Sequence, residues 1–232
     1  MYNTLHNKKI CIIGGSSGIG LAVAGQAHSL GARIIICSRN AVAKHQELAE
    51  EIGTDIETYY LDATSEKETA LTLHKIGVID HLVITIRPEI TPAPFVATDI
   101  EQAKKAFEAK FWGSYQLIQQ AHKHINSNGS IVMTSGIAGE KIYKNHSTMA
   151  LINGATETLC RALAVELAPI RINVVSPGFV GPKPEEIEQY ARQFPLKRVA
   201  MPKEVAESYI YLMTSTFITG TTVVVDGGAR LI

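Results

Sequence analysis

One stretch constrains this chain more than any other: an apolar run that breaks into glycines and then continues as a helix-forming run. Residues 10–20 read ICIIGGSSGIG, and a helical pattern follows at Leu21–Leu30. This order predicts a strand, a glycine turn and a helix. Glycines let the backbone approach a ligand closely, and a helix N-terminus offers unpaired N–H groups and partial positive charge to a phosphate. Because the glycines lie in this context, the stretch predicts a dinucleotide-binding turn.

The rest of the chain alternates apolar runs with helical patterns. The expected strands are Ile10–Ile13, Arg33–Cys37, Ile56–Tyr60, His81–Ile86, Ser130–Thr134, Arg171–Val175 and Thr222–Val225. The expected helices are Leu21–Leu30, Val42–Ile52, Ser65–Lys75, Asp99–Ile125, Met149–Leu167 and Pro202–Met213. Near-continuous apolar strands between helices are typical of a parallel sheet covered on both faces. We therefore predict an α/β fold: a single-domain, Rossmann-type doubly wound parallel sheet of about seven strands with helices on both faces.

Composition narrows the class of protein. The 232 residues suit one domain spanning 1–232, with 46% hydrophobic residues, 19% charged residues and a formal net charge of zero. This balance argues against nucleic acid or a membrane surface as partner, and no run approaches the roughly 20 apolar residues that span a bilayer. We expect the three cysteines to be buried, reduced thiols in a cytoplasmic protein whose N-terminus lacks a signal peptide.

The residues after the second and third expected strands bear on the nucleotide. In a dinucleotide fold, Ser38-Arg39-Asn40 faces the adenosine ribose, where Arg39 suits a 2′-phosphate. NADP(H) is therefore preferred over NAD(H); the alternative is that Arg39 simply caps the strand end in solvent. Asp62, at the end of the third strand, either accepts a hydrogen bond from the adenine amino group or starts the next helix.

These and several other segments together resemble the short-chain dehydrogenase/reductase family over nearly the whole chain. Besides residues 14–20, the matching segments are Leu61-Asp62, Asp80-His81-Leu82-Val83, Ser135-Gly136-Ile137-Ala138-Gly139, residues 171–178 (RINVVSPG), Thr219-Gly220 and Asp226-Gly227-Gly228. The resemblance implies carbonyl reduction or alcohol oxidation with a nicotinamide cofactor. It also implies a homodimer or homotetramer, formed through the helices expected at Asp99–Ile125 and Met149–Leu167.

The resemblance also implies which residues hold the cofactor. They are Gly14, Ser16, Ser17, Gly18, Ile19, Gly20, Ser38, Arg39, Asp62, Ala63, Asn153, Pro177, Gly178 and Val180. Two supporting motifs depart from the family's pattern: Ile13 stands for a threonine, and Arg87 stands where a glycine lies close to the cofactor. Arg87 must therefore point elsewhere or reach the phosphates. No metal is expected, because His122 and His124 have no companion ligand in the sequence.

The catalytic pattern of the family is absent. Its Asn-Ser-Tyr-Lys tetrad corresponds to Lys110, Gly136, Met149 and Asn153 in this sequence. An alignment slip does not restore the Tyr-Lys pair, because none of the eight tyrosines has a lysine four residues later. Methionine offers no proton, so Met149 cannot replace the tyrosine as the family's proton donor.

Four residues are candidate replacements. A lysine in a half-buried pocket can have a lowered pKa, so Lys110 can act as acid or base, or it can bond the strand backbone or a water. Ser135 lies beside the serine position but on the other side of the strand. Tyr143 and His146 border the expected substrate pocket, either as proton donors or as residues of its rim. His146 shares the face of Met149 only if the helix begins early.

Three functions follow from these observations. The first is a divergent NADP(H)-dependent reductase that acts on a small carbonyl or hydroxyl compound with a relocated or water-borne proton donor. The second is a non-redox enzyme on the same scaffold, an isomerase, lyase or cyclase. The third is a catalytically silent NADP(H)-binding sensor or oligomer partner. The fold does not decide between them, because function depends on the site.

Overall fold

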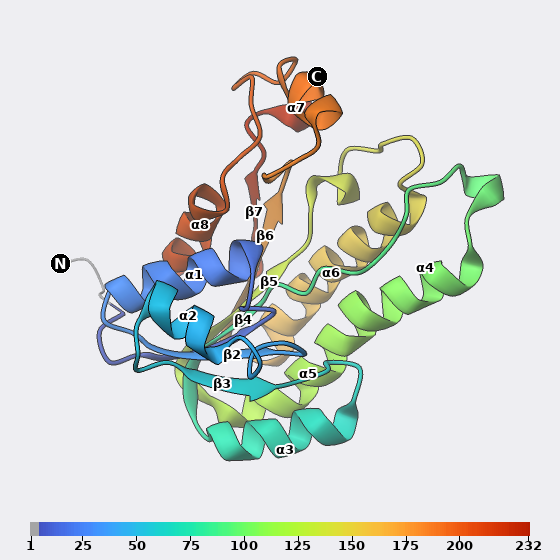
Figure 1. Cartoon of the computed structure of the whole chain (residues 1–232). Coiled ribbons are helices and arrows are strands. Elements are labelled where there is room, and N and C mark those ends of the chain that lie inside the picture. Colours follow the sequence, from blue (N-terminus) through green and yellow to red (C-terminus); the bar gives the residue numbers. More distant parts are fainter. Residues whose placement is uncertain (1–4) are drawn as a thin grey trace.

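The sheet at the centre of the structure has seven parallel strands in the order β3-β2-β1-β4-β5-β6-β7 (Figure 1). The computed structural model describes residues 5–232. The strands are β1 Lys9–Ile13, β2 Arg33–Ser38, β3 Glu57–Tyr60, β4 Ile79–Ile84, β5 Ile125–Thr134, β6 Arg171–Pro177 and β7 Thr222–Val225. The predicted α/β fold with a doubly wound parallel sheet is confirmed.

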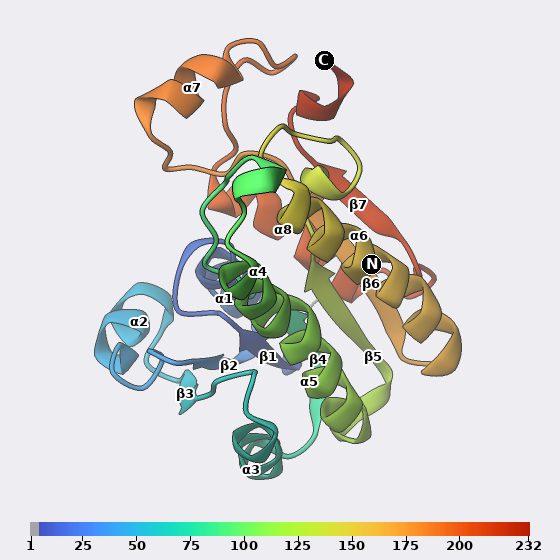
Figure 2. The same ribbon diagram turned by 90° about the vertical axis from the view of Figure 1, so that its right-hand side faces the viewer.

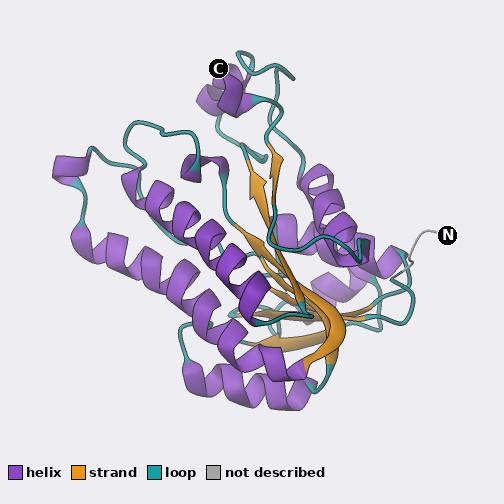
Figure 3. Ribbon diagram, turned by 180° about the vertical axis from the view of Figure 1, so that it is seen from behind, coloured by secondary structure: helices purple, strands orange, loops and turns teal. Residues whose placement is uncertain are grey.

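Helices cover both faces of this sheet. They are α1 Gly18–Ser29, α2 His45–Ile52, α3 Glu66–Ile76, α4 Ile100–Phe107, α5 Gly113–Ala121, α6 Ser147–Glu166, α7 Glu185–Ala191 and α8 Pro202–Thr214. A π-helical turn, η2 Glu108–Trp112, joins α4 to α5. Side chains of α1, α2 and α8 pack on one face of the sheet, and those of α3, α5 and α6 pack on the other. Figures 2 and 3 show the sheet between these two groups of helices.

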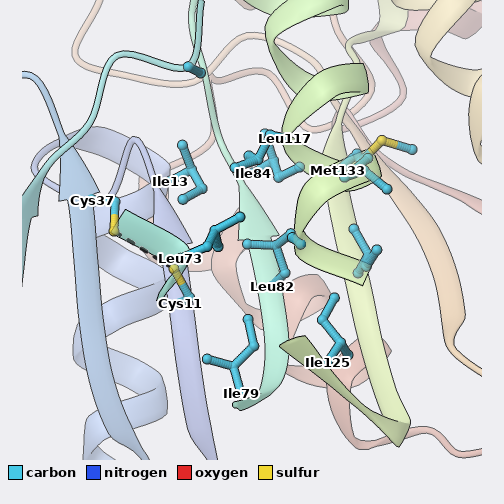
Figure 4. Packing of buried hydrophobic residues seen from close by; sticks show 14 of the residues in the cluster. Cys11, Ile13, Cys37, Leu73, Ile79, Leu82, Ile84, Leu117, Ile125 and Met133 are labelled. Atoms are coloured by element: carbon cyan, nitrogen blue, oxygen red, sulfur yellow. Dashed lines mark hydrogen bonds between the residues drawn. The ribbon is translucent and has the colours of Figure 1, made fainter. Parts of the chain in front are cut away.

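Strand β1 explains why these strands are apolar on both sides. Ile10 and Ile12 point into the core under α1, whereas Cys11 and Ile13 point into the core under α3 and α5 (Figure 4). Side chains alternate between the faces of a strand, so a strand covered on both faces has no polar side. All three cysteines are buried and free, as expected.

The strand order places a topological switch point at the end of β1. Strand β1 pairs with β2 on one side and with β4 on the other, so the chain leaves it in opposite directions for the two halves of the sheet. Ligands of open α/β sheets bind at such a switch point, outside the carboxyl ends of the strands. The glycine turn at residues 14–20 follows β1 directly and lies there.

Several predicted boundaries are wrong, and tertiary contacts explain the differences. The helix predicted at Asp99–Ile125 is interrupted by the π-helical turn and α5 ends at Ala121, because Ile125 already pairs with Ile79 as the first residue of β5. Strand β4 ends at Ile84, not Ile86, where its pairing with Ile13 of β1 ends.

Two helices also differ from the sequence patterns. Helix α2 begins at His45 rather than Val42, since the preceding residues form a hydrogen-bonded turn. The short helix α7, which begins after Pro184, was not among the expected helices. None of the helices in residues 5–232 is long and apolar enough to cross a membrane.

The first prediction concerns the contact that holds α1 against the glycine turn. A Cβ atom on Gly20 would lie 2.5 Å from the carbonyl oxygen of Gly14 and 2.5 Å from Oγ1 of Thr85. The substitution Gly20→Ala must therefore move the backbone, and we expect it to lower the free energy of unfolding by about 1–3 kcal/mol in urea titrations.

Gly25→Ala in the same helix is the matched control. A Cβ atom there meets no atom within 4 Å, so we expect this variant to gain about 0.4–1 kcal/mol from reduced freedom of the unfolded chain. Equal stabilities of the two variants would contradict the proposed close approach.

Candidate functional site

The glycine turn is shaped by close backbone contacts. Gly14 has φ +81°, a conformation that favours glycine, and its N–H donates to the carbonyl oxygen of Cys37 over 2.8 Å. A Cβ atom on Gly14 would lie 2.9 Å from Oγ1 of Thr85, the first residue after β4. The turn therefore lies against the end of β4, and side chains at these positions would displace it.

The turn presents hydrogen-bonding groups at the start of α1. Ser17 is the N-cap of α1, yet its hydroxyl caps no backbone N–H and its side chain is exposed, as is Gly18. The first turn of a helix has N–H groups without an intrahelical partner. These groups and Ser17, with Ile19 beside them, form a cradle with the geometry of a phosphate site.

Two serines connect the cradle to β2. The hydroxyl of Ser38, at the end of β2, donates to the hydroxyl of Ser16 over 2.9 Å, and the N–H of Asn40 donates to Ser38 Oγ. Arg39 lies between them in sequence and its side chain is 65% exposed, with Nη2 3.5 Å from Oε1 of Glu89. Its guanidinium is therefore not held by a buried carboxylate and can meet a ligand.

Asp62 lies beside Arg39 at the end of β3. Its Oδ1 accepts hydrogen bonds from the N–H and the hydroxyl of Thr64, at 3.0 and 2.8 Å. The backbone bond from Thr64 lowers the pKa of Asp62, and the charge of Arg39 lowers it further. The structure thus shows Asp62 in the turn before α3. Its predicted contact with adenine stays a prediction, as does the cofactor-binding role of Ala63.

The residues that follow β6 also lie at the carboxyl edge of the sheet. Gly178 follows Pro177, its N–H donates to the carbonyl oxygen of Val225 over 2.9 Å, and a Cβ atom on it would lie 2.9 Å from Asp226. Val180 then forms an isolated bridge with Ala200. The predicted cofactor residues of β6 therefore lie at the same edge of the sheet as the glycine turn.

Lys110 is the unexpected group at this edge. It lies in the π-helical turn between α4 and α5, and only 5% of the residue is exposed. Its Nζ donates to the carbonyl oxygen of Ser135 over 2.9 Å and to Oδ1 of Asn153 over 2.8 Å. Single π-turns recur at functional sites. This one places the lysine between β5 and α6.

Burial governs the ionisation of Lys110. Desolvation lowers its pKa from 10.5 to about 8, and the negative charge of Glu157 opposes this shift. Lys110 therefore carries its proton at neutral pH, and it loses that proton at a lower pH than an exposed lysine does.

Ser135 and Gly136 complete the cluster around Asn153. The hydroxyl of Ser135 donates to Oε1 of Glu157 over 2.7 Å, so it points toward α6 and is engaged there. A Cβ atom on Gly136 would lie 3.0 Å from Nδ2 of Asn153. A side chain at position 136 would therefore press against the asparagine amide.

Met149 lies one helical turn before Asn153 on α6. It is half-buried and lines a crevice of about 20 Å³, together with Thr148 and residues 90–93. Such a volume holds about one water molecule. The positions corresponding to the family's tyrosine and lysine are thus occupied by a thioether and by an amide that Lys110 engages.

Tyr143 and His146 make none of the hydrogen bonds of Lys110 and Ser135, although His146 lines the same crevice as Met149. The helix begins at Ser147, so His146 stands before it as the N-cap, and its Nδ1 bonds the carbonyl oxygen of Lys144 over 2.8 Å. It therefore does not share the helical face of Met149. The Tyr143 ring packs edge-on against Phe179 at 5.8 Å, and burial raises the pKa of Tyr143 to about 12.

Two features of the site escape the sequence analysis. Glu157, the partner of Ser135, had only its position four residues after Asn153 as a signal. Lys183, which follows β6, is half-buried, and its pKa is lowered by burial and by the charge of Arg87. Within residues 5–232, no group of three or more metal-ligating side chains could hold a metal ion.

The second prediction tests the burial of Lys110. In the unfolded chain its pKa returns to 10.5, so between about pH 8 and 10.5 the unfolded state binds more protons than the folded state. The free energy of unfolding therefore rises with pH across this range, and Lys110 accounts for a rise on the order of 3 kcal/mol. We expect Lys110→Met to remove this rise from the pH dependence of the free energy of unfolding.

Lys105→Met is the matched control, because Lys105 is an exposed lysine of α4. This variant should keep the slope of the unsubstituted protein. An identical slope for Lys110→Met would mean that Lys110 titrates as an exposed lysine does.

Comparisons with known proteins agree with this geometry. A family model described as Enoyl-(Acyl carrier protein) reductase matches residues 14–230. The short-chain dehydrogenase/reductase ATR9 of Stachybotrys chlorohalonatus is 35% identical, and the alignment covers 98% of this chain and 99% of that protein. Both matches include the glycine turn and the ends of β4, β5 and β6.

Solved structures give the same result. A small-chain dehydrogenase in complex with NADPH superposes with a TM-score of 0.84 at 29% identity, covering 97% of this chain and 100% of that one. MalC Reductase/Diels-Alderase from Malbranchea aurantiaca superposes with a TM-score of 0.91 at 28% identity, covering 100% and 99%. With a family model over most of its length and a full-length relative at 35% identity, the chain belongs to the short-chain dehydrogenase/reductase family.

Proposed function

We propose that this protein is an NADP(H)-dependent reductase of a small carbonyl compound. The observation that carries the proposal is the cradle formed by the glycine turn, which fits a dinucleotide diphosphate. Gly14 and Gly20 leave room that a Cβ atom would fill, and the exposed Ser17 and Gly18 begin α1 at the switch point of the sheet. The similar small-chain dehydrogenase solved with NADPH supports the choice of nucleotide.

The preference for NADP(H) over NAD(H) rests on Arg39. Its exposed guanidinium follows the Ser16–Ser38 hydrogen bond at the end of β2, where the adenosine ribose of a Rossmann-type fold lies. A planar guanidinium binds phosphate through two parallel N–H donors. The nearby carboxylate of Asp62 already accepts two hydrogen bonds from Thr64, so it competes weakly for Arg39.

The groups at the end of β5 support catalysis by charge stabilisation. When bound, NADPH supplies a hydride to the carbonyl carbon, and negative charge then develops on the carbonyl oxygen. Lys110 offers a buried positive charge and Asn153 offers amide N–H donors at this edge. Fixed donors of this kind stabilise developing oxyanions strongly. Met149 has no proton to give, so the proton comes from solvent.

A second candidate function has a specific observation behind it. MalC, which superposes over the whole of this chain, is described as a reductase and a Diels-Alderase. Donors that polarise a carbonyl group without transferring a proton also serve non-redox reactions such as isomerisation or cyclisation. If the nucleotide binds but neither carbonyl reduction nor a non-redox reaction is found, the protein is a catalytically silent NADP(H)-binding sensor.

We also propose that the protein forms a homodimer or homotetramer. Large apolar side chains are exposed on the helices that the resemblance implicates: Ile100, Trp112 and Tyr115 on α4 to α5, and Leu151 and Val165 on α6. Exposed apolar side chains mark interaction sites on soluble proteins where they join into one patch.

The third prediction tests nucleotide choice. We expect NADPH to bind in a fluorescence titration, and Arg39→Ala to weaken NADPH binding about 10–100-fold while leaving NADH binding nearly unchanged, since a charge-assisted contact contributes about 1.5–3 kcal/mol. Arg33→Ala, at the other end of β2, is the control and should bind both nucleotides normally. Equal losses for NADPH and NADH in Arg39→Ala would refute the 2′-phosphate contact.

The fourth prediction tests redox chemistry directly. A panel of small ketones and aldehydes should include compounds that accelerate the loss of NADPH absorbance, and stoichiometric alcohol should appear. NADPH binding without turnover of any carbonyl compound would shift the assignment to the non-redox candidate or to the silent binder. Absence of binding at millimolar NADPH would contradict all NADP(H)-dependent functions.

A further inference from the structure

We propose that Lys110 is a positioning residue whose ammonium group fixes the orientation of the Asn153 carboxamide. Nδ2 of Asn153 is then the hydrogen-bond donor that the site presents to an oxygen atom of a bound ligand. The identity of that ligand rests on the proposed function: a ribose hydroxyl of the nucleotide or the carbonyl oxygen of the substrate. The orientation itself does not depend on it.

The first step is the chemistry of the Lys110 contact. An ammonium group has three donors and no acceptor, whereas a carboxamide has an acceptor oxygen and a donor nitrogen. The group of Asn153 that lies 2.8 Å from Nζ must therefore be the oxygen. The carbonyl oxygen of Ser135, 2.9 Å from Nζ, fixes the ammonium from a second direction. With the oxygen held, the Asn153 nitrogen must point away from Lys110.

The second step is where that nitrogen points. Nδ2 is the atom nearest to the missing side chain of Gly136, 3.0 Å from the position of a Cβ atom there. Among residues 5–232, no protein acceptor is hydrogen-bonded to Nδ2, although Asn153 is only 2% exposed. Gly136 follows the end of β5, at the carboxyl edge of the sheet. The donor therefore faces the edge where ligands of this fold bind.

The residue types at positions 110 and 153 differ from those of the family. The resemblance assigns an asparagine to position 110 and a lysine to position 153, and this chain has the two residue types exchanged. In this chain the cation at position 110 holds the oxygen of the amide at position 153, so the cation lies behind the amide. The group facing the ligand is then a neutral N–H donor, which polarises an oxygen atom and transfers no proton.

The groups around Lys110 determine how long this orientation lasts as pH rises. Glu157 of α6 is the charged side chain whose field acts on Lys110, and the Ser135 hydroxyl binds it. Strand β5 otherwise contributes the Ser135 carbonyl, and α5 contributes Ser114, whose hydroxyl bonds the Lys110 carbonyl over 2.6 Å. Once Lys110 is a neutral amine it can also accept a hydrogen bond, so Asn153 is no longer restricted to one orientation.

The test is an NMR titration of the Asn153 side-chain amide in the ligand-free protein. Asn153→Asp identifies the resonance pair by its loss. We expect the pair to shift with an inflection near pH 8, where the pKa of Lys110 lies, and the inflection to disappear in both Lys110→Arg and Lys110→Met. Arginine keeps the positive charge throughout this range and provides a folded variant if the methionine variant unfolds.

A flat Asn153 signal across the pH range in the unsubstituted protein would overturn the proposal. So would an inflection that survives in Lys110→Arg. Because neither outcome depends on the nucleotide, the pH titration tests the orientation of Asn153 independently of the proposed function.

Two further NMR titrations, with NADP⁺ and with cyclohexanone, identify the oxygen atom that Nδ2 contacts. A shift of the Asn153 pair on addition of NADP⁺ alone assigns the ribose, and a shift that needs cyclohexanone added to the NADP⁺ complex assigns a carbonyl oxygen. Gly136→Ala places a methyl group against Nδ2 and should abolish either shift. If NADP⁺ moves the backbone signals of the glycine turn and neither ligand moves Asn153, the ligand-facing role is refuted. If NADP⁺ moves no signal, the proposed function fails, whereas the orientation is decided by the pH titration.

Discussion

The hydrogen bonds of one buried ammonium group connect three parts of the site. Lys110 Nζ binds the end of β5 through Ser135 and the middle of α6 through Asn153, while its own backbone lies in the π-helical turn between α4 and α5. A buried charge that loses its acceptors is strongly destabilising. The relative positions of these three segments therefore depend on the Lys110 ammonium group. Gly136 lies against the Asn153 amide that this group holds.

The nucleotide-binding half of the site depends on a different constraint, the close approach of backbone segments around β1. Gly14 and Gly20 contact each other and the first residue after β4, so the turn, the helix start and the central strands are one rigid unit. Apart from Ile13 and Arg87, this half corresponds to the family's pattern, whereas the residues at the tetrad positions depart from it. The protein thus keeps the elements that hold a nucleotide and differs in the groups that act on a ligand beside it.

The sequence predicted those parts of the structure that local patterns determine. The apolar runs and the glycine turn sufficed for the doubly wound sheet and for the position of the cradle, because strand and helix periodicities are local properties. The π-helical turn at Lys110, the bond between Ser135 and Glu157 and the orientation of Asn153 could not be predicted, since each depends on segments brought together by folding. His146 was ambiguous for a similar reason: several residues around it can cap a helix.

The central claim is that the nucleotide held by the glycine turn meets the Lys110–Asn153 pair rather than a proton-donating dyad. A crystal structure of the protein with NADP⁺ tests it most directly. The account predicts the diphosphate at the start of α1, the 2′-phosphate at Arg39, and the nicotinamide ribose and ring beside Gly136, with Asn153 Oδ1 still bonded to Lys110. A nicotinamide ring outside this space, or Lys110 turned away from Asn153 toward the ligand, would contradict it.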